Sequence, residues 1–261
     1  NFFNYPTSFD TREADRALKG SGISVPPLED YAWVLWDYWE RHLDPELFID
    51  RSLSGHVKDK VVLVTGGSSG IGKATALMMA EAGAKVLVVA RKESELKETK
   101  DEIESKGGTA FTYSCDLADF AAADKLCEKV LAEHGAVDVL VNNAGRSIRR
   151  SINLSYDRFH DFERCMQLNY FGSLKMILGL LPVMEERHSG HIINISSIGV
   201  LTNAPRFSAY VASKAALDAF SRCAAAEFND TGVAFTTINM PLVRTPMIAP
   251  TKIYESVPTI T

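Results

Sequence analysis

The stretch TGGSSGIG, Thr65 to Gly72, decides the fold because it lies between a β-branched run and an amphipathic segment of helical length. Its glycines allow a tight turn and let backbone N–H groups approach an anion at the start of the following helix. A glycine-rich run in this position is typical of dinucleotide sites, whereas elsewhere it is weak evidence. The residues expected to bind the cofactor here are Gly66, Ser68, Ser69, Gly70, Ile71 and Gly72.

Short β-branched runs alternate with helix-length amphipathic segments from residue 58 onward. The runs are KVVLVT (60–65), KVLVVA (85–90), TAFTYS (109–114), VDVLV (137–141), HIINIS (191–196) and VAFTTIN (233–239). Nearly continuous apolar strands that alternate with helices predict an α/β fold, a Rossmann-like doubly wound parallel sheet with helices on both faces. Ligands on such sheets bind at the carboxyl ends of the strands, so the residues that follow each strand are the candidate site.

Composition narrows the class of protein. The 261 residues are 46% apolar, and the net charge of −5 argues against nucleic acid as a partner. The apolar stretch 174–184 is too short to span a bilayer. We therefore expect a cytoplasmic protein, with peripheral contact to membrane or lipid left open. The cysteines lack the spacing of a metal site or a disulfide framework, which predicts free thiols and no metal at Cys115, Cys127, Cys165 and Cys223.

Residues 1–57 differ from the rest and are expected to form a connector, with the main domain at 58–261. They hold all three tryptophans, in LEDYAWVLWDYWERHLDPELF (28–48). One helical face there combines Tyr31, Leu35, Tyr38 and Trp39. This face indicates either a helix docked on a neighbouring surface or a contact with a membrane or an acyl chain.

Three strand ends carry further candidates for cofactor binding. A cofactor without a 2′-phosphate usually meets an acidic residue after the second strand, but this chain has Arg91 and Lys92 there. Arginine pairs well with phosphate, so these cations favour NADPH over NADH, unless both are ordinary solvated charges. The third and fourth strands are followed by Asp116 and Leu117 and by Asn143, Ala144 and Gly145.

The fifth strand leads to a pattern that can donate a proton. Tyr210 and Lys214 are four residues apart and therefore neighbours on a helix, thirteen residues beyond Ser197. A free phenol has a pKa of about 10, and a nearby ammonium lowers it by favouring the phenolate. The pair alone is weak evidence, but it gains weight from a serine after a neighbouring strand and the dinucleotide turn upstream.

At this point residues 58–247 resemble the short-chain dehydrogenase/reductase family, on the motifs TGGSSGIG, NNAG, LNYFG and YVASK. The resemblance implies a catalytic tetrad of Asn169, Ser197, Tyr210 and Lys214. Tyr210 would donate the proton, and Ser197 would hold the carbonyl oxygen. Lys214 would bind the nicotinamide ribose and tune Tyr210, and Tyr210 would itself contact the cofactor. Asn169 would support a water-linked proton path.

The chain departs from that family after its sixth strand. It reads NMPLVRT (239–245), with Met240-Pro241 where the family has Pro-Gly. Thr245 still aligns as a contact of the nicotinamide amide, but a proline restricts the turn that a glycine would leave free. Only sixteen residues follow Thr245, so we expect the seventh strand of the family to be missing.

Three long runs, 142–172, 191–223 and 240–254, resemble bacterial fatty acyl-CoA reductases more closely. This implies reduction of a long-chain acyl-CoA to a fatty aldehyde with NADPH, in the C-terminal module of a two-domain, alcohol-forming enzyme. A second reductase domain in the same parent chain is the implied partner. Reduction of a fatty aldehyde to an alcohol is the alternative, and a non-catalytic NADPH-binding docking module is the contrasting class. The family also implies a homo-oligomer, with Leu217 and Phe220 contributing apolar surface.

The run NNAGRSIRRS (142–151) places arginines beside the expected site. Arg146, Arg149 and Arg150 follow the fourth strand, at the rim where substrate would enter. A CoA substrate carries three phosphates, so at least one arginine could bind phosphate. The alternative is that they pair with nearby carboxylates, at Asp157, Asp161 or Glu163.

Overall fold

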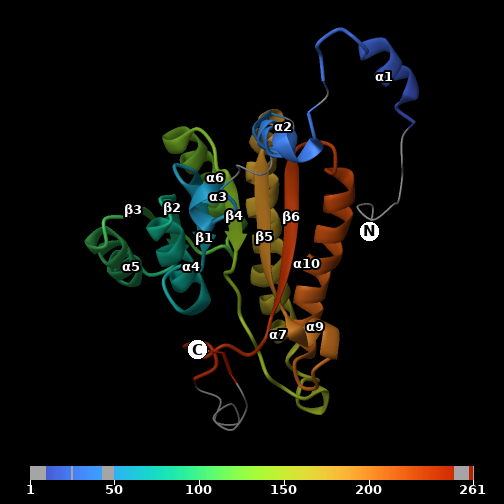
Figure 1. Cartoon of the computed structure of the whole chain (residues 1–261). Helices are drawn as coiled ribbons and strands as arrows, with labels where there is room; N and C mark the ends of the chain where they lie inside the picture. Colours follow the sequence, from blue (N-terminus) through green and yellow to red (C-terminus); the bar gives the residue numbers. More distant parts are fainter. Residues whose placement is uncertain (1–9, 25, 43–49, 250–258, 261) are drawn as a thin grey trace. The chain divides into compact units, whose positions relative to one another are not determined.

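The computed structural model describes residues 10–24, 26–42, 50–249 and 259–260 (Figure 1). They belong to two compact units, within residues 1–50 and 51–261. The described part of the first unit holds helices α1 (Arg12–Leu18) and α2 (Leu28–His42). The Trp-rich segment is thus a helix, as predicted. Its acidic first turn and basic last turn complement the helix dipole.

The second unit is built on a six-stranded parallel sheet of order β3-β2-β1-β4-β5-β6. The strands are β1 (Val61–Thr65), β2 (Lys85–Ala90), β3 (Thr109–Ser114), β4 (Val139–Asn142), β5 (Gly190–Ser197) and β6 (Val233–Met240). All six coincide with the predicted runs to within two residues. The doubly wound fold class is therefore confirmed. Within the described residues the sheet ends at β6, and an isolated parallel bridge, Val243 to Ile260, follows it.

Helices cover both faces of this sheet (Figure 1). Alternate strand residues point to opposite sides. Leu63, Leu87 and Leu140 face one core together with residues of α6, α8 and α10, while Val62 and Val86 face the other with residues of α4 and α5. Each such fully buried side chain contributes about 1.5–3 kcal/mol. The bounds are α4 (Gly70–Glu81), α5 (Glu93–Ser105), α6 (Phe120–His134), α8 (Ser173–Glu186) and α10 (Ser208–Glu227).

Shorter elements complete the unit. They are α3 (Leu53–Val57), η3 (Ile152–Leu154), α7 (Phe159–Met166), the π-helical turn η4 (Gln167–Gly172) and α9 (Ile198–Thr202). Val57 packs in the core of this unit, so α3 is part of the unit. The sequence had placed α3 at the end of the connector, residues 1–57. The prediction that Leu217 contributes to an oligomer surface is wrong, because this side chain is fully buried in the core. Phe220 is only partly buried, and homo-oligomerisation stays a prediction.

The strand order reverses between β1 and β4, which places a crevice at their carboxyl ends. The Thr65 hydroxyl joins the two strand ends. It donates to the carbonyl of Val141 at 3.2 Å and accepts from the backbone N–H groups of Asn143 and Ala144 at 2.9 and 3.0 Å. The candidate site is therefore built from the loops at this switch point.

Candidate active site

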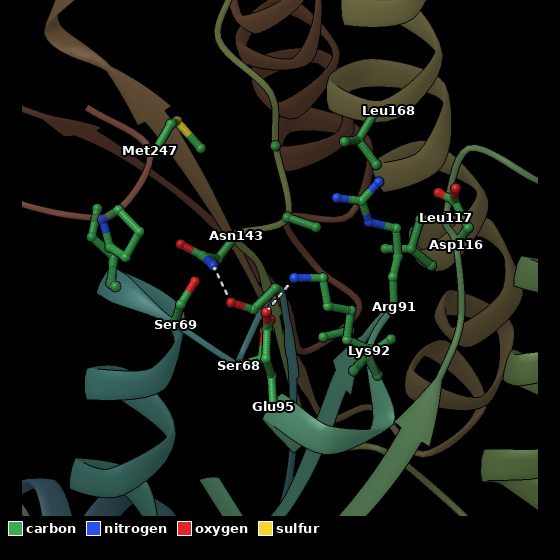
Figure 2. A pocket seen from close by; sticks show the side chains of 18 of the residues that line it. Ser68, Ser69, Arg91, Lys92, Glu95, Asp116, Leu117, Asn143, Leu168 and Met247 are labelled. Carbon is green, nitrogen blue, oxygen red and sulfur yellow. Dashed lines mark hydrogen bonds and ion pairs between the residues drawn. The ribbon is translucent and has the colours of Figure 1, made fainter. Parts of the chain in front are cut away.

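A first cavity of about 350 Å³ lies at the switch point (Figure 2). Of the predicted cofactor residues, it is lined by Gly66, Ser68, Ser69, Gly70, Ile71, Arg91, Lys92, Asp116, Leu117, Asn143, Ala144, Gly145 and Thr245. Gly72, Tyr210 and Lys214 do not line it. The remaining lining residues were not predicted from the sequence, and they are Val89, Ala90, Glu95, Cys115, Leu168, Pro246 and Met247.

Backbone geometry makes this cavity suitable for a pyrophosphate. Gly66 and Gly70 have φ angles of +66° and +53°, a region that favours glycine. Ser69 is the N-cap of α4, and its side chain makes no capping bond. The first N–H groups of α4 therefore remain available for an anion. Gly72 acts indirectly, because a Cβ there would clash with the carbonyl of Gly66 and the side-chain amide of Asn143.

Asn143 ties the glycine loop to the end of β4. Its Nδ2 donates to the carbonyls of Thr65 and Gly66, at 2.9 and 3.2 Å. Asp116 lies at the opposite wall, where its carboxylate accepts the backbone N–H of Ala118 at 3.0 Å. Both residues thus shape the loops that enclose the cavity.

A second cavity of about 290 Å³ is lined by most of the residues that were predicted to be catalytic. Ser197, Tyr210 and Lys214 line it, as the tetrad prediction requires. The two cavities meet, since they share Ile71, Asn143, Gly145, Thr245 and Met247. The other lining residues are mostly apolar and include Ile195, Ile198, Ala204, Phe207, Val211, Met240, Pro241, Leu242, Val243 and Ile248.

Ser197 and Tyr210 reach this cavity from adjacent elements. Ser197 ends β5 and caps α9, and its hydroxyl oxygen accepts the N–H of Gly199 at 3.1 Å. Tyr210 lies in the first turn of α10, where its ring makes an edge contact with Phe207 at a centroid distance of 6.5 Å. The arrangement places two hydroxyl groups beside an apolar space.

Lys214 lies one turn after Tyr210 and is only 4% exposed. Its ammonium donates to the carbonyl of Ile195 at 2.7 Å. Burial lowers its pKa to about 8, and the carboxylate of Asp218 opposes this decrease. Asp218 is itself buried, and its Oδ1 has no hydrogen-bond partner among the described residues. The lysine is therefore poised to change charge in a mildly alkaline range.

Asn169 is completely buried and does not line either cavity. Its Nδ2 donates to the carbonyl of Arg146 and to the hydroxyl of Ser213, both at 2.9 Å, and its Oδ1 accepts the N–H of Arg146 at 2.7 Å. It sits in the π-helical turn, where Gly172 packs so closely that a Cβ would lie 2.7 Å from the carbonyl of Leu117. The geometry makes Asn169 a positioning residue that holds the 145–147 loop against α10.

Comparison with known proteins agrees with this geometry. The family model of the short chain dehydrogenases matches residues 60–255. The chain belongs to this family. As a short-chain dehydrogenase it is an oxidoreductase.

Two relatives of this short-chain dehydrogenase are named fatty acyl-CoA reductases. One, from Acinetobacter baylyi, is 61% identical over 205 residues, which are 78% of this chain and 70% of the relative. Another, from Mycobacterium tuberculosis, is 48% identical over 222 residues, which are 84% of this chain and 76% of the relative. The predicted similarity to such reductases is confirmed. Among relatives that are 48% to 61% identical, the matched region spans only 63% to 76% of their length.

A solved relative shows the same fold with a nucleotide. It is a 3-oxoacyl (acyl-carrier-protein) reductase from Agrobacterium tumefaciens with NADP bound. It is 30% identical, with a TM-score of 0.73, and the match covers 80% of each chain.

The three arginines that were predicted to contact substrate, Arg146, Arg149 and Arg150, differ in their surroundings. Arg150 pairs with the buried carboxylate of Asp161 at 3.1 Å, which was one of the alternatives, and Arg158 pairs with it at the same distance. The hydrogen bond from Arg158, and to a smaller extent that from Arg150, lowers the pKa of Asp161 below its usual range. Arg149 is exposed and has no side-chain partner among the described residues. Arg150 therefore anchors the loop, while Arg149 stays a candidate for phosphate binding.

Proposed function

We propose that this protein reduces long-chain fatty acyl-CoA to fatty aldehyde with NADPH. The proposal rests chiefly on the second cavity, where Ser197 and Tyr210 stand beside a lining of apolar side chains. Such a lining suits an acyl chain, and the hydroxyl groups suit the thioester carbonyl at its end. The relatives named fatty acyl-CoA reductases support the same substrate class.

The choice of NADPH rests on the end of β2. Arg91 and Lys92 line the first cavity in the place where an acidic residue would favour NADH. The solved relative with NADP bound supports a nicotinamide cofactor. The helix N-terminus at Ser69 and the close approach of Gly66 to Gly72 suit its pyrophosphate. When bound, this cofactor supplies the hydride for the reduction.

The residues of the chain would stabilise the developing charge. The hydroxyls of Ser197 and Tyr210 donate hydrogen bonds to the thioester oxygen, and Tyr210 gives it a proton. Removal of one such oxyanion donor costs on the order of 3–4 kcal/mol in similar sites. The positive charge of Lys214 favours loss of the proton from Tyr210. Asn169 holds the 145–147 loop against α10 through its hydrogen bonds to Arg146 and Ser213. The proton then returns from the tetrahedral adduct to Tyr210, and the carbonyl re-forms as the C–S bond breaks. The CoA thiolate that leaves takes a proton from solvent, which gives the thiol and the aldehyde as products.

Several wider features are part of this proposal. A second reductase domain in the same parent chain is proposed on the sequence resemblance alone, because the matched region already spans 63% to 76% of these relatives. Homo-oligomerisation is proposed by analogy with the family. No helix in the described part of the chain is long and apolar enough to cross a membrane.

The test is product analysis with the purified protein, NADPH and palmitoyl-CoA. We expect equal amounts of hexadecanal, CoA thiol and oxidised NADPH, all formed about 10²–10⁴ times more slowly with Tyr210→Phe. Turnover of hexadecanal to hexadecanol without turnover of palmitoyl-CoA would instead support the aldehyde reductase. NADPH binding without turnover of either substrate would support the docking module.

A further inference from the structure

Glu95 is an unexpected acidic group in the nucleotide cavity. It lies in the first turn of α5, and its carboxylate bridges two residues that were predicted to bind the cofactor. Oε1 accepts from the Lys92 ammonium at 2.7 Å, and Oε2 accepts from the Ser68 hydroxyl at 3.1 Å (Figure 2). The bridge links the glycine loop to the end of β2, the two segments expected to meet the adenosine part of NADPH.

This carboxylate is ionised near neutral pH. The Lys92 ammonium first, and the Ser68 hydroxyl second, lower the pKa of Glu95 below its usual range. Its side chain is 38% exposed, and that of Lys92 is 69% exposed, so water screens the pair and it can open at small cost. A partner that binds Lys92 more strongly would therefore displace Glu95.

The 2′-phosphate of NADPH is such a partner, because it carries up to two negative charges and accepts strong hydrogen bonds. Of the basic residues at the end of β2, Arg91 makes no side-chain hydrogen bond or ion pair among the described residues, whereas Lys92 is already engaged. A phosphate would meet the Arg91 guanidinium, a Lys92 ammonium that Glu95 holds, and the negative charge of Glu95 itself. NADH lacks the 2′-phosphate, so it neither competes with Glu95 for Lys92 nor is repelled by the charge of Glu95.

We propose that Glu95 is a specificity-determining residue that weakens the preference for the 2′-phosphorylated cofactor by competing with the phosphate for Lys92 and Ser68. The inference rests on the proposed nucleotide site but not on the acyl substrate. It assigns a role to a residue of α5 that lies outside the glycine motif and the catalytic tetrad.

The decisive variant is Glu95→Gln, which removes the charge and keeps a side-chain group that can bond to Ser68. Exposed charge pairs are worth up to about 1 kcal/mol, and that corresponds to a change of about fivefold. We expect the Kd of NADPH to fall about fivefold, while the Kd of NADH stays within about twofold. The difference should shrink at high salt, since the effect is electrostatic.

The measurement is titration of nucleotide fluorescence with the full chain, in the absence of acyl substrate. Competition by 2′,5′-ADP and by 5′-AMP isolates the phosphate, and only the first should bind more tightly to Glu95→Gln. The matched control is Glu102→Gln. Glu102 is on the same helix and pairs with Lys73 and Lys106, outside the nucleotide cavity. This control should leave both Kd values unchanged.

Weaker binding of NADPH to Glu95→Gln would overturn the inference, because it would mean that the carboxylate orients Lys92 for the phosphate. An equal change for both cofactors, or no change, would overturn it as well. A different experiment detects failure of the proposed function. In that case the wild-type protein would bind NADPH but form no aldehyde from palmitoyl-CoA, and the comparison of nucleotide affinities would still be valid.

Discussion

The two cavities of the site share a wall but are built in different ways. The nucleotide cavity is formed by residues that follow consecutive strands, and it combines glycines with charged groups such as Arg91 and Glu95. The second cavity draws on β5, α9, α10 and the segment after β6, and its lining is largely apolar. Backbone shape and charge define the first, whereas the volume of side chains from distant segments defines the second.

This difference predicts how substitutions act. A change in the glycine loop alters the backbone and should affect every nucleotide. A change in the second cavity or at its rim should depend on the carbonyl substrate. Four substitutions test this division, beginning with the largest expected effect.

Tyr210→Phe should separate chemistry from nucleotide binding. The variant loses the proposed proton donor, and general acid catalysis contributes a factor of about 10²–10⁴ to the rate. We expect kcat with palmitoyl-CoA to fall by about that factor, while the Kd of NADPH from fluorescence titration stays close to that of the wild type. A similar loss of NADPH affinity would show that the two cavities are not independent.

Gly72→Ala should distort the nucleotide cavity although Gly72 does not line it. The added Cβ would clash with the Gly66 carbonyl and with the Asn143 amide, and overpacking of this kind costs about 1–3 kcal/mol. We expect a lower Tm together with weaker binding of NADPH and NADH alike. Gly107→Ala is the control. Gly107 has a φ of +81°, but a Cβ there would meet no atom of the described residues within 4 Å, so stability alone should fall, by about 1 kcal/mol.

Arg149→Glu should act only on substrates that carry CoA. Exposed charge contacts are worth about 0.2–1 kcal/mol, so KM for palmitoyl-CoA should rise up to about fivefold and KM for hexadecanal should not change. Arg150→Glu is the contrasting variant, because it breaks the pair with Asp161 and should affect both substrates. Equal effects of Arg149→Glu on both substrates would exclude it from CoA recognition.

Asp218→Asn should shift the pH profile with the smallest change in maximal rate. Lys214 loses its charge as the pH rises through about 8, so kcat/KM should decline on the alkaline side. Asp218 favours the charged lysine, whereas the carbonyl of Ile195 that the ammonium contacts is uncharged, and the Tyr210 phenol on the same cavity is still present in the variant. Loss of the carboxylate should therefore move the alkaline limb to lower pH. The exposed Asp230→Asn serves as a control, and an unchanged limb would contradict a role for Asp218.

Much of the site could be predicted because its residues follow strands. The alternation of apolar runs is enough to place Gly66, Arg91 and Ser197 at one edge of the sheet. Tyr210 and Lys214 are neighbours by helical spacing alone. The resemblance to the family supplied Asn169, although its complete burial and its bonds to Arg146 and Ser213 were not foreseen.

Other features depend on contacts that leave no local pattern. Glu95 lies three residues after Lys92, a spacing that allows an ion pair, but its bond to Ser68 joins residues 27 positions apart. The choice of Asp161 over Asp157 and Glu163 as the partner of Arg150 depends on how α7 packs beside the loop. Leu217 and Phe220 look alike in the sequence, and only the packing of α10 buries the first completely.

The sequence by itself determined the order of the strands and helices along the chain and the glycine turn, because period and turn geometry are local properties of the chain, and its resemblance to the family supplied the proposed tetrad. The tertiary structure decided which charges are paired, which tetrad member is buried away from the cavities, and how the two cavities meet. Those outcomes depend on burial and on distances between segments far apart in the chain, and both arise only when the helices pack on the sheet.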